Sequence, residues 1–582
     1  MGICGIIDFS NQSIDKNILL RMSNLLNHKA SGNKIIYQDN GLGIIQNTPI
    51  IFSKSKKLTT NNTGDIFVFL DGVLFNVNDS SIKNMKVDND IILYLYEKYG
   101  SHLFEHIEGE YSLVILDSLK NKIIIARDLN NSKQIYYTLL GDKFVFSSEI
   151  KAFFVLPEFK SAIDIYSLGD ILSYGHISYP NTLFEGVKRL QPCHFIIINK
   201  KTKNIKIEKY WDINLKKNNF VNNENKITKN LEKLFSNSII KRLNLNKNFG
   251  LFLSGGLDST MILYFLNKFS ESEVDTYTVN LPGDKHYASI ASEYFNTNHH
   301  ELDIDLSDII NITPKALWYL ETFPAGIDTF HYFLSKMSKK KTSVFLGQYS
   351  EKLFFCGKDF IFLKYLSKIK PLVLSINKLL HPEVKKLLFL GKSDLINLED
   401  PFKQYVNIKN IFDTKFKAYS IERIKKSTNY KLSDNALKNY SYISILNGYL
   451  SDTYFSFNQM VLNPFFDKGI LNFSFSIPQD LKLKNNNERY LLKKLLSNKI
   501  PKEILNRKKY YWSRDLNFIK GNIKILDYYI DKLRHRNMKL VSILDKSFFK
   551  NPVKILTLFN LEIFLEVFFD KNSTKEPKNL KI

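Results

Sequence analysis

The segment at residues 251–260, with the sequence LFLSGGLDST, constrains the fold of this chain more than any other. Its leading apolar residues predict a buried parallel strand, the serine and two glycines predict a tight turn, and the residues from Asp258 onward predict a helix. Two consecutive glycines let a bound group approach the backbone closely. The N–H groups of the turn, with the positive end of the helix dipole, then favour a phosphate. Asp258 is expected to ligate Mg²⁺ on a polyphosphate, since hard cations bind carboxylate oxygens. An ordinary glycine-rich turn is the alternative, and the complete order of strand, SGGLDS and helix disfavours it.

The periodicity of apolar residues changes along the chain. Short apolar runs separated by Asn, Asp and Gly predict a β-rich region over the first 210 residues. Strands are expected there at 66–70, 111–116, 122–126 and 144–147. The polar residues 212–225 predict a linker, and from 226 onward helical patterns alternate with short strands. Two of these, 276–279 and 344–346, are predicted to lie parallel to the strand at 251. Beyond about Tyr405 the pattern is mostly helical.

Composition excludes several classes of protein. With 582 residues, 44% of them hydrophobic, the chain is expected to form at least two domains with substantial cores. The net charge is +24 (82 Lys+Arg against 58 Asp+Glu), but the lysines are dispersed, so we expect a compositional bias and no nucleic-acid partner. Cys4, Cys193 and Cys356 are too few and too scattered for a disulfide framework or a zinc site, which favours a cytoplasmic location. The N-terminus lacks a signal-peptide pattern, and the sequence contains no long uncharged apolar run. We therefore expect neither secretion nor a membrane-spanning segment.

Several further motifs occur in a fixed order and together resemble the glutamine-hydrolysing asparagine synthetases, a family of class II glutamine amidotransferases. The resemblance runs from about residue 3 to about residue 569. In the first half its motifs are Cys4-Gly5-Ile6, Gly109, Asp117, Arg127-Asp128, Tyr136-Tyr137, Ser148-Glu149 with Lys151-Ala152, residues 182–186 and Tyr210-Trp211. In the second half they are SGGLDS, His299-His300-Glu301, Pro464-Phe465 with Asp467, and Arg507 with Lys508-Lys509.

The resemblance implies an α/β protein of two domains. Residues 1–212 would form a glutaminase type 2-like domain, an Ntn-hydrolase αββα sandwich. Residues 226–570 would form a doubly wound α/β adenine-nucleotide domain of the PP-loop type with a helical extension, and residues 571–582 a disordered tail. In the family, ATP and aspartate give an aspartyl-adenylate and pyrophosphate, and ammonia from glutamine displaces AMP to form asparagine. ATP and Mg²⁺ are therefore the expected cofactors.

The resemblance also implies which residues form the sites. Lys509 is expected to neutralise the α-phosphate, with an ordinary surface lysine as the alternative. Glu351 is expected to join Asp258 as a magnesium ligand. Asp467 is expected either to be a site carboxylate or to cap the segment that follows it. The residues expected to bind ATP and pyrophosphate are Phe252, Ser254, Gly255, Gly256, Leu257, Asp258, Ser259, Val279, Leu346 and Gly347.

The glutaminase half departs from the family pattern. Family glutaminases need cysteine as the first residue, because its α-amino group acts as the base, whereas Cys4 follows three residues and requires trimming. Asp71 and Gly72 stand in the family's Asn-Gly-Glu motif, with the acid lost. Asn47 replaces an arginine that would clamp the substrate carboxylate. Asp90, expected to meet the substrate amino group, is retained, so the sequence predicts a degenerate glutamine site.

The synthetase half departs as well. The family's Ser-Gly-Glu-Gly-Ser-Asp-Glu is here residues 346–352, LGQYSEK. Gln348 cannot carry the charge of the family's acid, and Tyr349 is expected to place bulk where glycine allows close approach. Lys352 reverses a charge, and Leu462 replaces an arginine. The first pyrophosphate loop, SGGLDS at residues 254–259, thus keeps the whole family motif, whereas the second, at residues 346–352, does not.

Several interpretations of function remain open. The first is an AMP-forming, ATP-dependent ligase that joins a small-molecule or peptide carboxylate to ammonia or an amine, with an impaired glutaminase half; lasso-peptide macrolactam cyclases are relatives of this kind. The second is a glutamine-hydrolysing asparagine synthetase whose Cys4 is exposed by processing. The third is a catalytically silent regulatory relative. A tRNA-modifying enzyme is weakened by the absence of paired Cys-x-x-Cys motifs. A homodimer is compatible with each interpretation.

Overall fold

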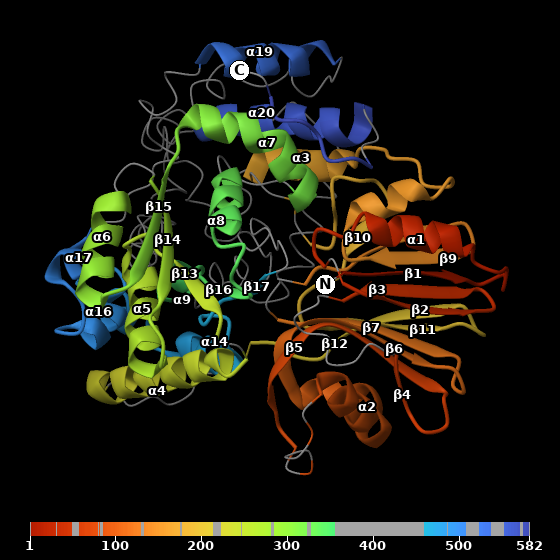
Figure 1. Ribbon diagram of the computed structural model, residues 1–582, viewed down its shortest axis with the longest axis horizontal. Coiled ribbons are helices and arrows are strands. Elements are labelled where there is room, and N and C mark those ends of the chain that lie inside the picture. Colours follow the sequence, from red (N-terminus) through yellow and green to blue (C-terminus); the bar gives the residue numbers. More distant parts are fainter. Residues whose placement is uncertain are drawn as a thin grey trace, which may run out of the picture.

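The computed structural model describes residues 2–354, 459–507, 523–536 and 552–580. Short internal gaps fall at 31, 49–57, 80, 82–84, 86, 130–132, 175–176, 178, 214–222, 246, 281–283, 323–327, 486 and 571–573. Cys356, Lys508, Lys509 and most of the helical region predicted beyond Tyr405 lie outside the described residues. Figure 1 shows the two antiparallel sheets of the N-terminal half beside the parallel sheet of the C-terminal half.

Two six-stranded antiparallel sheets form the N-terminal domain. In order, the first sheet contains β10 (Lys188–Arg189), β8 (Tyr136–Leu140), β9 (Lys143–Ser147), β1 (Gly2–Asp8), β3 (Leu42–Asn47) and β2 (Lys34–Asp39). The second contains β12 (Asn204–Lys209), β11 (His194–Asn199), β7 (Lys122–Arg127), β6 (Ile107–Asp117), β5 (Ile66–Val77) and β4 (Thr59–Thr60). Alternate residues such as Ile3, Phe69 and Phe146 pack in one core. Helix α1 (Lys16–Asn24) packs on β1 and β3, and α2 (Asp88–Tyr99) packs on β5. The predicted αββα sandwich is confirmed.

A five-stranded parallel sheet organises the C-terminal domain. Its order is β15 (Asn298–Asp303), β14 (Asp275–Asn280), β13 (Phe249–Phe252), β16 (Ser343–Phe345) and β17 (Met460–Leu462). Leu251 packs with α4 (Glu224–Leu243), α5 (Leu257–Phe269) and α6 (Asp284–Phe295). Its neighbour Phe252 points to the other face and packs with α7 (Leu306–Leu320) and α8 (His331–Met337). Helices therefore cover both faces, as the doubly wound prediction requires.

Shorter elements complete the described part of the chain. They are α3 (Ile165–Tyr174), α9 (Ser350–Phe354), α14 (Lys468–Ser476), α15 (Gln479–Lys482), α16 (Tyr490–Leu496), α17 (Lys502–Asn506), α19 (Ile523–His535), α20 (Pro552–Leu565), the 3₁₀ turns η2 (Gly100–Glu105), η3 (Ile150–Val155) and η4 (Asp328–Phe330), and the π-turn η9 (Glu566–Asp570). In the described residues, no helix has the length and apolar character that a membrane span requires.

The two domains share a core. Helix α20 packs against both α7 and α3, and Phe184 of the N-terminal domain contacts Phe564 and Phe568. Figure 1 shows these three helices together at the end of the molecule where the chain terminates. Residues 574–580, part of the tail predicted to be disordered, instead run along α7. Glu576 accepts a hydrogen bond from Tyr319 (2.8 Å), and the N–H of Leu580 donates to Asn311 (3.0 Å).

Candidate functional site

A cavity with a volume of about 290 Å³ opens at the carboxyl ends of β13 and β16. Strand order reverses between these two strands, because the chain runs from β13 outward to β15 before it returns to β16. Ligands of doubly wound sheets bind at such a switch point. The cavity is lined by Phe252, Leu253, Ser254, Gly256, Leu257, Asp258, Ser259, Tyr277, Thr278, Val279, Asp284, Phe330, His331, Leu334, Leu346, Gly347, Gln348, Arg489 and Arg507.

Glycines bring the two loops of the cavity together. Gly255 has φ +62°, and a side chain there would meet the backbone of Tyr287 at 2.2 Å. A Cβ on Gly347 would lie 3.1 Å from the carbonyl carbon of Asp258, which shows how closely the second loop approaches the first. The position of Gly255 therefore requires glycine, and a side chain at Gly347 would press on the first loop. The resulting turn leads directly into α5, whose N-terminal N–H groups face the cavity end of the sheet.

Two carboxylate–arginine pairs carry the charge of the cavity. Arg489 donates to Oδ2 of Asp258 at 2.9 Å, and the hydroxyl of Ser350 donates to Oδ1. Arg507 donates to Oδ1 of Asp284 at 2.5 Å and to the carbonyl oxygen of Ser254 at 2.8 Å. Each arginine thus lies beside the loop that is expected to hold phosphates, within reach of a polyanion.

The cavity gathers most of the predicted nucleotide residues. Among the predicted residues, Phe252, Ser254, Gly256, Leu257, Asp258, Ser259, Val279, Leu346 and Gly347 line it. Gly255 shapes the turn without lining the cavity, and Glu351 lies in α9 outside the lining. Sequence reasoning missed Asp284, Phe330, His331 and Arg489, which no local motif marks. Arg507 was named only as part of a family motif.

The second loop differs from its sequence prediction at Tyr349. Its φ is +71°, so the backbone keeps a conformation typical of glycine. Its ring is buried against Phe466, with 4.5 Å between the centroids, and does not line the cavity. The prediction that Tyr349 places bulk in the loop is therefore wrong, because its side chain turns into the apolar core.

Asp467 caps a helix. It is the N-cap of α14 and accepts a hydrogen bond from the N–H of Gly469 at 2.9 Å. Lys241 and Arg242 approach its carboxylate at 3.5 Å and 3.9 Å, and it does not line the nucleotide cavity. Of the two expected roles, the geometry favours the cap.

In the N-terminal domain, Cys4 lies inside β1. It pairs with Ile45 of β3 on one side and Ser147 of β9 on the other. The side chain is 0% exposed and packs with α1 residues such as Met22. Burial raises the pKa of the Cys4 thiol well above its ordinary value. A thiol in this environment is a poor nucleophile.

The predicted glutamine-binding residues are only partly brought together. Asn47 faces α1, where its amide donates to the carbonyl oxygen of Ser23 at 2.8 Å. The preceding residue, Gln46, points across the sandwich and donates to Leu70 at 2.6 Å. Because successive strand residues face opposite sides, Gln46 and not Asn47 faces the strand that carries Asp71.

Asp71 forms a closed ion pair. Its Oδ1 lies 2.9 Å from Nζ of Lys133, and both side chains are buried. Burial opposes ionisation of Asp71, but Lys133 holds the pKa of this carboxyl below its ordinary value. Gly72 has φ +145°, and a Cβ there would meet the carbonyl oxygen of Glu110 at 1.9 Å. The structure therefore requires glycine at this position for backbone packing.

An acid of α2 that contacts this strand is Asp88. Its Oδ2 accepts a hydrogen bond from the N–H of Leu74 at 3.0 Å, at the beginning of α2. Asp90, the predicted residue, is exposed on the same helix. Helical geometry explains the difference, since residues two positions apart in a helix point in different directions.

Comparisons with known proteins agree with this architecture. The model of the glutamine amidotransferase domain matches residues 1–211, and that of asparagine synthase matches residues 230–554, more than half of the chain. The chain belongs to the asparagine synthase family. Asparagine synthetase [glutamine-hydrolyzing] 3 of Bacillus subtilis is 23% identical over 87% of this chain and 86% of its own length. Putative asparagine synthetase [glutamine-hydrolyzing] 2 of Methanocaldococcus jannaschii is 26% identical over 63% of this chain and 75% of its own.

The cavity of this asparagine synthase family member fits ATP with Mg²⁺. The loop N–H groups and two arginines suit phosphate oxygens, and Asp258 suits the metal. Within the described ranges no group of three acidic, histidine or cysteine side chains forms a metal site, so phosphate oxygens would complete the coordination at Asp258. The buried Oε1 of Gln348 has no hydrogen-bond partner among the described residues. An acceptor at this point suits a hydroxyl or amino group of a ligand.

Proposed function

We propose that this protein is an ATP-dependent carbon–nitrogen ligase that activates a carboxylate as an acyl-adenylate. A carboxylate oxygen would attack the α-phosphorus as the bond to pyrophosphate breaks. The nitrogen of the second substrate would then attack the acyl carbon, with AMP as the leaving group. The observation that carries this proposal is the cavity at the β13–β16 switch point, where the SGGLDS loop, Asp258 and two arginines converge.

The charges of the cavity suit this chemistry. Loop N–H groups, Arg489 and Arg507 are placed to stabilise negative charge that develops as pyrophosphate leaves. Mg²⁺, when bound at Asp258, would supply further stabilisation of that charge. Lys509, outside the described residues, remains the proposed cation for the α-phosphate.

We further propose that the nitrogen comes from ammonia or another amine. A glutaminase of this type needs a cysteine thiol beside its own free α-amino group, whereas Cys4 lies within β1 with its thiol buried. Trimming the chain to Cys4 would remove Gly2 and Ile3 from β1, including the hydrogen bond of 2.9 Å from the Ile3 N–H to Ser148. The closed pair of Asp71 and Lys133 further supports an impaired glutamine site.

Pyrophosphate release from ATP tests both the activation of the carboxylate and the source of the nitrogen. The intact mass of the purified chain is measured alongside it. Aspartate is the first acid, peptides with acidic side chains are the second, and ammonium or glutamine supplies nitrogen. We expect ammonium to support release, and glutamine to fail. Glutamine-dependent release from a chain that begins at Cys4, lost in Cys4→Ala, would instead identify a glutamine-hydrolysing asparagine synthetase. No release with any acid would favour a regulatory relative.

A further inference from the structure

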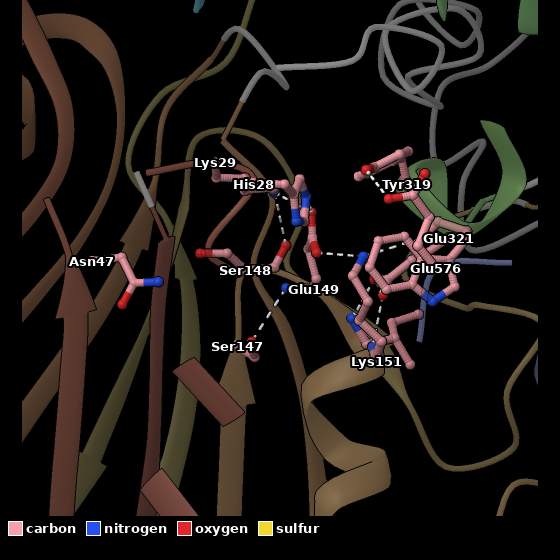
Figure 2. Close-up of polar contacts among 12 residues, drawn as sticks. His28, Lys29, Asn47, Ser147, Ser148, Glu149, Lys151, Tyr319, Glu321 and Glu576 are labelled. Carbon is pink, nitrogen blue, oxygen red and sulfur yellow. Dashed lines mark hydrogen bonds and ion pairs between the residues drawn. The ribbon is translucent and has the colours of Figure 1, made fainter. Parts of the chain in front are cut away.

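Four buried ionisable side chains meet where the two domains touch (Figure 2). His28, Glu149 and Lys151 come from the N-terminal domain, and Glu321 comes from the C-terminal domain. None of these side chains is more than 15% exposed. We call them the interdomain charge cluster. Burial of this many ionisable groups is costly unless each group is paired and hydrogen-bonded.

Glu321 joins the ends of two helical elements. It is the C-cap of α7, with φ +52°, and its carboxylate accepts hydrogen bonds from the N–H groups of Ile150 and Lys151, the latter at 2.7 Å. Nζ of Lys151 lies 3.1 Å from the same carboxylate and donates to the carbonyl oxygen of Trp318 at 3.1 Å. A carboxylate thus satisfies the N-terminal donors of η3, while a lysine satisfies a C-terminal carbonyl of α7.

The N-terminal domain supplies the second half of the cluster. Glu149 pairs with Lys151 and lies 2.8 Å from His28 and 3.0 Å from Lys29. Burial opposes ionisation of Glu149, but His28, Lys151 and Lys29 together hold its pKa below the ordinary value. Burial lowers the pKa of His28, against the opposing effect of Glu149.

A packed path leads from Glu321 to the nucleotide cavity. Leu320, the last residue of α7, packs in a small apolar cluster with Tyr332 of α8. The two residues before Tyr332, Phe330 and His331, line the cavity, and their rings stack with 4.0 Å between the centroids. Because a close-packed core transmits displacement, this packing is a route by which a shift of the α7 end would reach this wall of the cavity.

We propose that Glu321 is a positioning residue through which Lys151 and Glu149 of the N-terminal domain hold the α7–α8 wall of the nucleotide cavity in its binding geometry. The N-terminal domain would then serve the ligase site by fixing its shape, independently of any supply of nitrogen. This inference rests on the proposed function, because it assigns the cavity to ATP. It accounts for a buried charge cluster whose net contribution to stability alone is expected to be small.

ATP binding in the presence of Mg²⁺, measured by calorimetry on the full chain, tests the proposal without knowledge of the acid substrate. We expect Glu321→Gln, which keeps the shape of the side chain, to weaken ATP binding about tenfold. The control is Glu158→Gln, which removes a carboxylate paired with Lys143 in an exposed contact of the N-terminal domain and should leave ATP binding unchanged.

The pH dependence separates a positioning role from a purely structural one. Burial raises the pKa of Glu321 to about 7, against the opposing effect of Lys151. Since this pKa is raised in the folded state, the associated stability is present below the ordinary pKa of glutamate and is lost as pH rises to about 7. The ionised carboxylate is the form that accepts both N–H groups, so ATP affinity should rise over the same interval. The charged and titratable groups that surround this region are Lys151, Glu149, His28, Lys29, Lys315, Tyr319 and Glu576.

The ratio of ATP affinities between wild type and Glu321→Gln cancels the titration of ATP and of every other group that both proteins share. From pH 5.5 to 8, about the interval set by this pKa, we expect wild type to lose stability and to gain ATP affinity relative to the variant. Equal ATP affinity at every pH, or affinity that simply follows stability, would overturn the positioning role. ATP binding by wild type with no change in the variant would overturn this inference alone, whereas no ATP binding by wild type would overturn the proposed function with it. If Glu321→Gln fails to fold, Glu321→Asp, which keeps the charge and shortens the reach to the two N–H groups, provides the comparison of ATP affinity.

Discussion

Two carboxylate–cation pairs of the same length mark the two halves of the molecule, and their surroundings differ. Asp71 and Lys133 lie 2.9 Å apart, with 2% and 9% of their side chains exposed. Asp258 and Arg489 are also 2.9 Å apart, but they line a cavity of about 290 Å³, and 17% of the Asp258 side chain is exposed. The first pair is closed on itself, whereas the second lies where a ligand can exchange with either partner.

This difference shows when an ion pair indicates a binding site. A polyphosphate can draw Arg489 away from Asp258 while a metal takes the freed carboxylate, so each group finds a new partner. A ligand that entered at Asp71 would have to displace a lysine that is itself buried, and the displaced ammonium would lose its partner. The pair in the N-terminal domain is therefore interpreted as structural, and the pair in the C-terminal domain as a ligand site.

The largest expected effect is on the closed pair. Lys133→Met leaves the carboxylate of Asp71 buried without its cation, so we expect the free energy of unfolding to fall by about 3–5 kcal/mol. Urea denaturation measures this change, and the double variant Lys133→Met/Asp71→Asn should recover most of it. Lys143→Met, in an exposed pair with Glu158, is the control and should cost about 0–1 kcal/mol. A loss of stability as small as this for Lys133→Met would contradict the interpretation of Asp71 and Lys133 as a closed structural pair.

Substitution in the cavity pair, Asp258 and Arg489, should change activity more than stability. Asp258→Ala removes the proposed magnesium ligand, so we expect pyrophosphate release to fall about 100-fold or more. Asp303→Ala, an exposed carboxylate on β15, is the control and should keep full activity. Urea denaturation should show a smaller loss for Asp258→Ala than for Lys133→Met, because the lost contact lies at the edge of a cavity. Unchanged ATP consumption in Asp258→Ala would contradict the assignment of this site.

Residues that act through local sequence were predictable. Strand periodicity and the SGGLDS turn predicted a β-rich first half and a parallel sheet in the second, while the sandwich was implied by the family resemblance; nearly all loop residues around Asp258 line the cavity. These predictions succeed because a strand, a turn and a helix start each depend on neighbouring residues. The orientation of α5 and its loop then follows from the sheet.

Residues whose roles depend on register or long-range packing were not predictable in the same way. A shift of one position in β3 separates Asn47 from Gln46 and turns the side chain to the opposite face. Arg489 reaches Asp258 from 231 positions away, and no local pattern marks it. Tyr349 shows the same limit, since only the position of Phe466 reveals where its ring packs.

The smallest expected effect concerns Cys4. Because its thiol is 0% exposed and burial raises its pKa, native protein should react with iodoacetamide at Cys4 far more slowly than urea-unfolded protein, as peptide mass spectrometry can measure. Cys4→Ala should leave ammonium-supported pyrophosphate release unchanged and cost about 1 kcal/mol in stability. Cys193→Ala, at the other buried cysteine of this domain, is the matched control. Rapid native labelling of Cys4, or loss of turnover in Cys4→Ala alone, would show a reactive thiol and would make the N-terminal domain a second chemical site.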